Sequence, residues 1–562
     1  MVSDSNTKTI TEDESIDMSD GNILSDQKQV ALAQQDLDHR LTKWQAVKAY
    51  PQACIYILIL VWSLITVGYE NQASGIVLSV PTFRRDFGYA VVSDGETQYT
   101  LDPQWQSAIT GGASAALVFG SFMGTTIVDY VGRKWIMTTC VVGTIAFVGV
   151  EFAATNIQVF FIGKFLNAIL LGVIQTVGAS YVAELTPLAL RGICTMTVNL
   201  SFCVGPFICT IVAYFTSTRD DRWSYRAIFC SQWFFAVTAS VFLFFIPESP
   251  YHHVLKGNDD KALGSLRKIH PDGSAESQLA VIRATVDEAK VLSKSGSWFE
   301  VFNKKNIKRT LIAIAPFLMQ PLSGLAYVMS YQTYYFQIAG ITTRESFKIS
   351  CGAQALSVVG TLLSLFMVDR FGRRFILLYG MSSLAVLNLL IAALGLNRSS
   401  QPLLLASSAF LTMYNFFYNS GIGPIAYVYN TEIPTSRLRA KTVAVGIASS
   451  NSLNTMWAFV LPYMFNVDQA NMGSAINFIF AGCCFVSVFV FFFFMPEASG
   501  RSYEEIDEMF MAKVPYRKWS SYVTSVSVES KQVILEQCKE ETEHVEEVKK
   551  NEVLTNDKQV IV

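Results

Sequence analysis

The chain has 562 residues, of which 51% are hydrophobic and only 16% are charged, and its formal net charge at pH 7 is −2. Soluble domains are typically about a quarter charged, so this composition argues against an ordinary water-soluble protein and indicates one that lies in lipid. A net charge this close to zero gives no electrostatic case for a nucleic-acid partner.

The ten cysteines lie mostly inside apolar runs. They show neither the C-x-x-C spacing of a metal site nor the pattern of a small disulfide-stapled domain, so we expect packing residues. The sequence also shows no nucleophile–base set, no metal-ligand cluster and no phosphate-binding loop. It therefore predicts no metal, no cofactor and no enzymatic activity.

The first forty residues are polar and acidic and contain no apolar segment of the kind found in signal peptides. Beyond them, the apolar segments come close to the roughly 20 residues that a helix needs to cross a bilayer. The segments are 53–78, 105–128, 135–154, 158–182, 193–215, 227–246, 311–336, 350–368, 375–395, 403–427, 443–465 and 475–495. They predict an all-α membrane protein with twelve transmembrane helices in two six-helix bundles.

This pattern divides the chain into five expected parts. They are a disordered cytoplasmic N-terminal tail (1–50), an N-terminal six-helix bundle (51–247), a cytoplasmic helical linker (248–310), a C-terminal six-helix bundle (311–496) and a cytoplasmic C-terminal tail (497–562). Within the linker, apolar residues recur at helical spacing over 259–270, and 276–292 also has a helical pattern.

The lysines and arginines of the short loops predict the orientation, because such residues favour the cytoplasmic side. On this map they gather on the side that also holds the linker and both termini. We therefore expect a multi-pass protein, in the plasma membrane, with both termini in the cytoplasm. The sequon Asn397-Arg398-Ser399 falls on the opposite side, where Asn397 is a candidate for glycosylation.

Three short motifs occur twice, once in each set of six spans. They are VDYVGRKW and VDRFGRRF (128–135 and 368–375), YVAELTPLALRG and YNTEIPTSRLRA (181–192 and 429–440), and IPESP and MPEAS (246–250 and 495–499). Each pair follows the equivalent span of its half: the second, the fourth and the sixth. The chain is therefore expected to contain two parallel repeats, related by an axis along the membrane normal.

With these motifs in this order, residues 53–508 resemble the sugar porter branch of the major facilitator superfamily. The sequences of residues 432–442, 197–202 and 331–336 are most similar to those of fungal maltose and α-glucoside permeases. The resemblance implies a secondary transporter that carries a small-molecule sugar, such as maltose, another α-glucoside or a hexose, across the lipid bilayer by alternating access. Proton-coupled import is the expectation.

Charged residues within the spans are the sharpest functional signal, because each costs about 2.5–3.5 kcal/mol at a helix centre. Glu70 in the first span and Lys164 in the fourth lie at matching depth, so we expect them to pair. The resemblance implies that Glu70 takes the coupling proton, although the family usually has aspartate and arginine at these positions. Since lysine can itself lose a proton, a purely structural ion pair is the alternative. Glu151 is expected to reach the membrane surface from the third span.

The resemblance also implies the residues of a sugar site. They are Asn199, Gln320, Tyr427 and Asn451, with Asn419 as a further amide. Three positions where relatives carry amides are instead Pro206, Pro321 and Ala326, which makes the expected site less polar. Hydrogen bonding between helices is the alternative for each lone amide.

The charged loops predict a gate on the cytoplasmic side. Its candidate residues are Asp129, Arg133, Glu184, Arg191, Asp369, Arg373, Glu432, Arg437 and Arg439. We expect Glu184 to pair with Arg373 or Arg374, and Glu432 with Arg133 or Lys134, so that the two halves are held together. Charge-based anchoring alone is the alternative, but it would not require the repeated acidic residues.

Two other functions fit the same scaffold. One is a facilitator or exporter of another hydroxylated small molecule, and the other is a nutrient sensor that does not transport. Family sensors usually carry a very long cytoplasmic tail, and the tail here is about sixty residues past the last span. That length favours transport.

Overall fold

The computed structural model describes residues 43–93, 96–186, 190–269, 275–280, 282–283, 286, 298–304, 306–397, 400–434, 438–465, 469–498 and 503–524. The expectations for residues 1–42 and for the acidic end of the chain beyond residue 524 lie outside these ranges.

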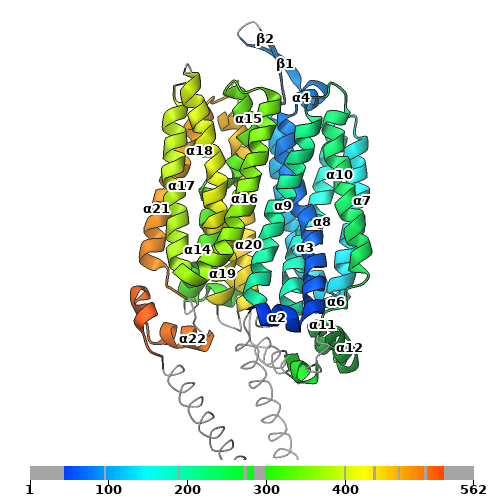
Figure 1. Cartoon of the computed structure of the whole chain (residues 1–562), viewed down its shortest axis with the longest axis vertical. Helices are drawn as coiled ribbons and strands as arrows, with labels where there is room; N and C mark the ends of the chain where they lie inside the picture. Colours follow the sequence, from blue (N-terminus) through cyan, green and yellow to red (C-terminus); the bar gives the residue numbers. More distant parts are fainter. Residues whose placement is uncertain are drawn as a thin grey trace, which may run out of the picture.

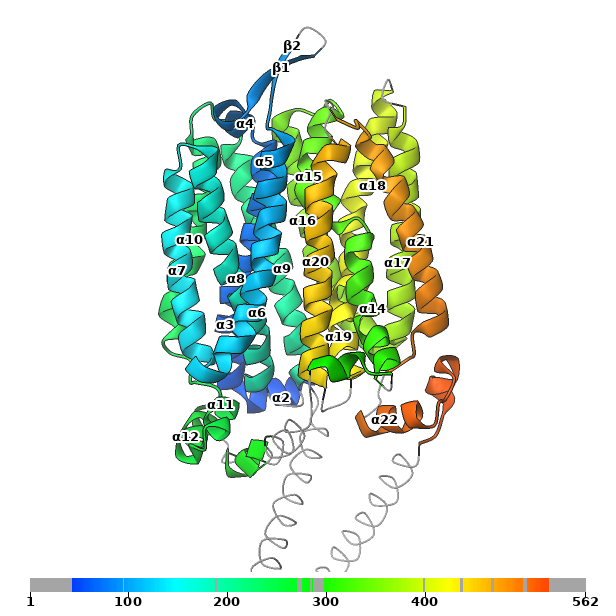
Figure 2. The same ribbon diagram turned by 180° about the vertical axis from the view of Figure 1, so that it is seen from behind.

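The first set of predicted spans forms a bundle of long helices. They are α3 (Pro51–Ile76), α5 (Pro103–Ser107) continued by the π-helix η2 (Ala108–Gly112) and α6 (Ala113–Val131), α7 (Arg133–Ala153), α8 (Ile157–Leu185), α9 (Arg191–Thr216) and α10 (Trp223–Leu243). The second set forms a second bundle beside the first (Figures 1 and 2). It consists of α14 (Ile307–Leu322) and α15 (Leu325–Ile338), α16 (Thr343–Phe371), α17 (Arg373–Gly395), α18 (Gln401–Ser420) and α19 (Ile422–Glu432), α20 (Arg439–Phe465), and η5 (Gly473–Ala475) with α21 (Ile476–Phe494).

The same helix pairs pack together in both bundles. In the first bundle they are α6 with α8, α7 with α8, α7 with α10 and α3 with α9. In the second bundle the counterparts are α16 with α18, α17 with α18, α17 with α21 and α14 with α20. The repeated motifs therefore correspond to a repeated packing arrangement, as expected for two parallel repeats.

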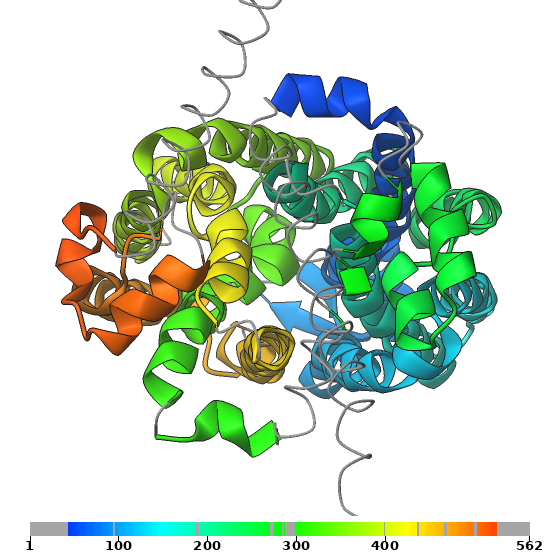
Figure 3. The same ribbon diagram turned by 90° about the horizontal axis from the view of Figure 1, so that it is seen from below.

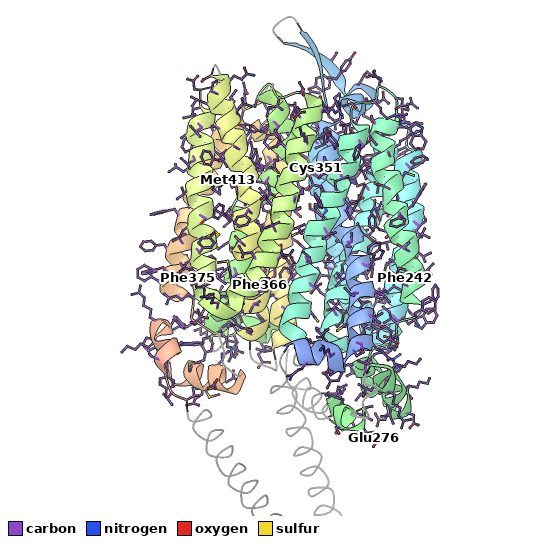
Figure 4. The ribbon with its side chains drawn as sticks, viewed as in Figure 1. Phe242, Glu276, Cys351, Phe366, Phe375 and Met413 are labelled. Carbon is purple, nitrogen blue, oxygen red and sulfur yellow. The ribbon has the colours of Figure 1, made fainter. Side chains whose placement is uncertain are left out.

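Ten helices of the described residues are long and apolar enough to cross a membrane. The two remaining predicted spans are also helical, as α18–α19 and α20. They are more polar, and α20 carries the run Ser449 to Asn454 in its middle. On the outside of the bundles, Phe242, Phe366 and Phe375 are exposed, as Figure 4 shows, which is the surface that lipid tails would cover.

Two of the long helices are interrupted. Gly324 separates α14 from α15 in a left-handed conformation with φ of 97°, which glycine adopts without strain. The other interruption, between α18 and α19, is at Gly421. Pro424 lies in the first turn of α19, where the amide hydrogen that proline lacks has no helical partner to lose.

The two bundles touch along their length. The main contacts join α9 to α16, α6 to α20 and α3 to α15. In the middle of α9, the Cys203 thiol lies 3.2 Å from Thr361 Oγ1 and donates to Asn419 Oδ1 at 3.3 Å. These contacts link the bundles through neutral polar groups.

Short elements cover the two ends of the bundles (Figures 1 and 3). We call one end the linker end, where α11 (Pro250–Leu255), α12 (Asp259–Ile269) and the 3-10 helix η4 (Trp298–Phe302) lie. The other is the hairpin end, where α4 (Pro81–Phe87) leads into an antiparallel hairpin of β1 (Tyr89–Ser93) and β2 (Glu96–Thr100). The helix predicted at 259–270 is confirmed as α12, whereas most of 281–292 lies outside the described residues.

A C-terminal segment folds back onto the linker end of the second bundle (Figure 3). It consists of α22 (Tyr503–Met511) and the 3-10 helix η6 (Tyr516–Ser521). Trp519 is fully buried in the core of this bundle, and its Nε1 donates to Val514 O at 3.1 Å. Arg309 of α14 forms an ion pair with Asp507 of α22. The predicted C-terminal tail therefore begins with a packed segment.

Replacing Trp519 with alanine should destabilise the protein by about 3–5 kcal/mol, because it removes a fully buried aromatic side chain. Thermal unfolding of the purified protein in detergent measures this. Met511→Ala is the matched control, since that side chain in the same segment is 83% exposed. Equal unfolding temperatures for the two variants would contradict the docking of this segment.

Candidate functional site

The repeated charged loops at the linker end are held by a repeated carboxylate. α7 and α17 each begin directly after a glycine with positive φ, Gly132 at 101° and Gly372 at 82°. Glu248 accepts from the backbone N–H groups of Arg133 and Lys134, at 2.8 and 3.2 Å. A helix N-terminus has unpaired N–H groups and a positive dipole end, so a carboxylate stabilises it.

The second bundle repeats the same arrangement. Glu497 accepts from the backbone N–H groups of Arg373 and Arg374, both at 3.0 Å. Two tyrosines add a matching bond, because Tyr181 donates its hydroxyl to Pro247 O and Tyr429 donates to Pro496 O. The IPESP and MPEAS motifs thus supply carboxylates that cap the two charged octapeptides.

Each gating glutamate has an arginine partner in its own bundle. Arg133 Nε lies 3.1 Å from Glu184 Oε2, and Arg373 Nη2 lies 3.4 Å from Glu432 Oε1. Each of these pairs lies within one bundle, whereas the sequence predicts pairs between the bundles. The reason is local: each arginine begins the third helix of its half, directly beside the end of the fourth helix.

His252 completes the first of these clusters. Burial lowers the pKa of His252 below its usual value, so the ring is neutral at cellular pH. A guanidinium has only donors, so Nδ1 of the ring accepts from Arg133 Nη1, at 3.2 Å. Among the other gating candidates, Arg437 and the side chains of Asp129, Arg191, Asp369 and Arg439 lie outside the described part of the structure.

The second group of charges lies inside the first bundle. Lys164 of α8 is fully buried and forms an ion pair with Glu70 of α3, as the sequence predicts. Glu151 of α7 joins them, with Oε2 3.6 Å from Lys164 Nζ. The expectation that Glu151 reaches the membrane surface is wrong, because its side chain is also buried.

The surroundings of Lys164 hold its ammonium group in place. The rings of Phe160 and Phe229 lie 5.7 and 5.3 Å from Nζ, within the range of cation–π attraction. Asn167 donates to Glu151 Oε1 at 3.3 Å. A cation with two carboxylates and two aromatic faces is well compensated in a dry environment.

A cavity of about 120 Å³ lies between the bundles and reaches this cluster. It is enclosed by residues of α3, the π-helix η2, α6, α8, α15 and α20. Its polar lining residues are Glu70, Asn71, Ser74, Thr110, Ser114, Gln175, Ser330, Asn451 and Asn454. The lining contains no aromatic side chain among the residues that the structure describes.

Several polar atoms of the cavity wall have no hydrogen-bond partner within the described residues. They are Glu70 Oε2, Gln175 Oε1 and Asn451 Nδ2. Buried polar atoms are normally paired with protein or water, so unpaired atoms that border a cavity are available to a ligand or a proton.

The structure brings one of the predicted sugar-site residues, Asn451, to the cavity wall. Gln320 donates to the backbone oxygens of Ile422 and Gly423, at 3.2 and 3.1 Å, and so braces the start of α19. Asn419 donates to Asn415 O at 3.0 Å. Tyr427 packs edge-on against Phe317 with ring centroids 4.9 Å apart. Asn199 is buried in α9 and is not among the lining residues.

The sequence analysis missed three amides of the wall: Asn71, Gln175 and Asn454. A signal for them exists in the sequence. Asn71 follows Glu70 directly, Gln175 is an amide in the apolar run of α8, and Asn454 follows Asn451 by nearly one helical turn.

The hairpin end is closed by contacts between the bundles. Arg84 of α4 donates to Gln337 Oε1 at 2.9 Å, and Gln337 Nε2 donates to Ser79 O at 2.9 Å. Below them α3 and α15 meet backbone to backbone, since a Cβ on Gly75 would lie 2.6 Å from Ser330 Cα. These contacts join the two bundles at the hairpin end, next to the cavity residues Ser74 and Ser330.

Comparison with known proteins agrees with this architecture. The family model described as sugar (and other) transporter matches residues 56–510. A general alpha-glucoside permease of Saccharomyces cerevisiae is 30% identical over 492 residues, which cover 86% of this chain and 79% of that protein. A maltose permease of the same organism is 28% identical over 485 residues, which cover 85% and 78%.

Solved structures show the same fold. The proton:xylose symporter XylE, bound to 6-bromo-6-deoxy-D-glucose, matches with a TM-score of 0.66 and 20% identity, over 82% of this chain and 99% of that one. An inward open conformation of the xylose transporter XylE from E. coli matches with a TM-score of 0.65 and 19% identity, over 81% and 99%. The predicted major facilitator fold, with its all-α architecture, is confirmed.

Gly75→Ala should prevent the close approach of α3 to α15 and favour a state that is open at the hairpin end. Because the added Cβ meets backbone, the helices must separate, and we expect substrate uptake to fall about tenfold, equivalent to about 1.4 kcal/mol. Uptake rates at matched expression measure this. Gly482→Ala is the control, since nothing lies within 4 Å of a Cβ at that position. Wild-type uptake in Gly75→Ala would refute the closure.

Proposed function

Because the chain belongs to the sugar (and other) transporter family, we propose that it is a secondary transporter that imports a sugar together with protons by alternating access. The observation that carries this proposal is the position of Glu70. Its carboxylate borders the cavity between the bundles and is also the partner of the buried Lys164. The Glu70 carboxylate can therefore contact a substrate in the cavity, accept a proton and pair with Lys164.

The proposed substrate is a maltose-like α-glucoside or a hexose. The amides of Asn71, Gln175, Asn451 and Asn454 provide donors and acceptors of the kind that can bind sugar hydroxyls. The similarity to alpha-glucoside and maltose permeases supports this class of substrate.

We assign the linker end to the cytoplasm and the protein to the plasma membrane. The loops at this end carry the excess of lysine and arginine that favours the cytoplasmic side. Both ends of the described chain, α2 (Lys43–Ala49) and η6, also lie there. With the hairpin end closed, the structure then corresponds to an inward-facing state.

Coupling would follow from the protonation of Glu70. When Glu70 is ionised, it holds Lys164 and α3 to α8. A proton from the hairpin side neutralises this carboxylate, weakens the pair and lets α3 and α8 readjust around a bound sugar. A shift of a few kcal/mol is enough to change which state dominates. The membrane potential contributes about 2.3 kcal/mol per charge per 100 mV.

We propose that the charged residues at the linker end form the gate. In the inward-facing state, Glu184 and Glu432 are paired within their own bundles. We propose that they and the neighbouring arginines exchange partners between the bundles when the linker end closes. A pair of this kind contributes no more than about 1 kcal/mol where it is exposed and more where it is dry, which is enough to bias two states that differ by a few kcal/mol.

A second candidate function is a facilitator or exporter of another hydroxylated small molecule. The lack of aromatic side chains in the described cavity lining favours it, since sugar rings usually stack on aromatic faces. The two functions differ in whether a proton accompanies the substrate.

Glu70→Gln should lose accumulation against a gradient and keep exchange of substrate, because glutamine is a permanently neutral analogue of the protonated carboxylate. Cells that express the wild type should alkalinise the medium when sugar is added, and Glu70→Gln cells should not. The control is Glu345→Gln, whose carboxylate is exposed at the hairpin end. Intact uptake by the wild type without alkalinisation would identify a facilitator.

Asn451→Ala should raise the KM for the transported sugar about fivefold, as expected for one lost hydrogen bond of about 1 kcal/mol. Asn419→Ala should leave this KM unchanged, because Asn419 is held by Asn415 and Cys203. Initial uptake rates of radiolabelled maltose, α-methylglucoside and glucose, in yeast without its own transporters, measure both variants. A comparable increase in KM for Asn419→Ala would instead favour the sugar site that the sequence predicts, which contains both amides.

A further inference from the structure

The buried cluster of the first bundle holds two carboxylates and one ammonium. Glu70 and Glu151 lie on either side of Lys164, and all three side chains are buried. Ionisable groups nearby include the Cys209 thiol of α9, beside Lys164, and the Tyr69 hydroxyl of α3. Arg226 of α10 lies over the ring of Phe152, the residue after Glu151. Glu70 alone would balance the charge of Lys164. The second carboxylate, Glu151, therefore needs another explanation.

The fold makes room for Glu151. A Cβ on Gly163 of α8 would lie 3.1 Å from Glu151 Cγ and 3.2 Å from its backbone nitrogen. The glycine thus lets α8 pass close to α7 at the point where the carboxylate enters the cluster. Asn167, one helical turn further along α8, donates to Glu151 Oε1. The carboxylate is therefore held in a defined place beside Lys164.

The two carboxylates differ in their access to the cavity. Glu70 borders it and has one oxygen, Oε2, without a hydrogen-bond partner. Glu151 is not among the residues of the cavity wall. A proton that enters from the cavity therefore reaches Glu70 first, and Lys164 lies between that carboxylate and Glu151.

We propose that Glu151 is the second counterion of Lys164, a positioning residue that holds the ammonium when a proton from the cavity neutralises Glu70. This inference rests on the proposed function, in which Glu70 takes the coupling proton. An O–H bond forms at Glu70, Lys164 stays charged, and its ammonium moves from Glu70 toward Glu151. The O–H bond breaks again when the proton leaves to water on the other side of the membrane.

This second counterion removes the main obstacle to coupling through a buried lysine. Neutralising the sole partner of a dry ammonium leaves an isolated charge, which strongly disfavours protonation of that partner. With Glu151 present, the cluster passes between a net charge of −1 and 0 and never becomes positive. The lysine can therefore remain charged through the whole cycle.

The test is a set of substitutions read by thermal unfolding of the purified protein without sugar. Glu70→Gln and Glu151→Gln should each unfold close to the wild type, because one counterion remains. The double variant should lose far more than the sum of the two, since the ammonium is then bare. Adding Lys164→Met should restore most of the loss. Glu345→Gln is again the control, a carboxylate whose lysine partner is exposed.

A second measurement tests the role in transport. The pH profile of radiolabelled maltose and glucose uptake should move to more acidic pH in Glu151→Gln, by about one unit or more. A role in packing alone would instead lower uptake by the same factor at every pH. Glu151→Asp, which keeps the charge, should restore most of the wild-type profile.

An additive double variant, a loss that Lys164→Met does not restore, or an unshifted pH profile would each overturn the inference. The unfolding measurements need neither sugar nor a proton gradient. If the wild type fails to alkalinise the medium while the double variant remains non-additive, the proposed proton coupling fails and the counterion assignment stands.

Discussion

The architecture depends on one interaction that occurs twice: a glutamate at the end of the sixth span caps the N-terminus of the third span. Glu248 and Glu497 each accept two backbone N–H groups at a loop that turns through a glycine with positive φ. Because the capped helix also packs against the fourth, the carboxylate ties three helix ends into one unit. Such a unit suits the proposed alternating access, in which each bundle moves as a rigid body.

Inside the first bundle, the rule that buried charges need compensation shapes the packing. Lys164 is surrounded by carboxylates and aromatic rings rather than by aliphatic side chains. These partners come from several helices, so the charge fixes how α3, α7 and α8 sit relative to one another. The second bundle has no such cluster among its described residues, and its interior is joined by neutral groups such as Asn388 and Tyr414. The two bundles therefore share the same helix packing but not the same buried charges.

The sequence predicts the spans, the repeat and the Glu70–Lys164 pair because each leaves a local mark: a long apolar run, a duplicated motif or a rare charge. It does not predict features that depend on contacts between distant elements. In the sequence, Glu151 lies near the end of a span and is expected to reach the membrane surface. In the structure, α8 approaches α7 closely at Gly163 and buries this side chain. The docking of Trp519 depends on the surface of a bundle that ends about 25 residues earlier. The hairpin of β1 and β2 was not predicted, although Asp94-Gly95 is a typical turn pair.

The contact between Cys203 and Thr361 has a mechanical consequence. It lies in the middle of α9, on the most extensive contact between the bundles, so it is close to the axis about which they would rotate in the proposed transport cycle. Near this axis a rotation moves the bundles only slightly relative to each other. The same rotation gives a larger displacement toward the ends of the helices, at Gly75 on one side and at Glu184 on the other. A weak contact through the Cys203 thiol is sufficient there, because the rotation hardly changes the distance between its two partners. Charge-bearing contacts are useful at the ends, where the displacement is large enough to make or break them.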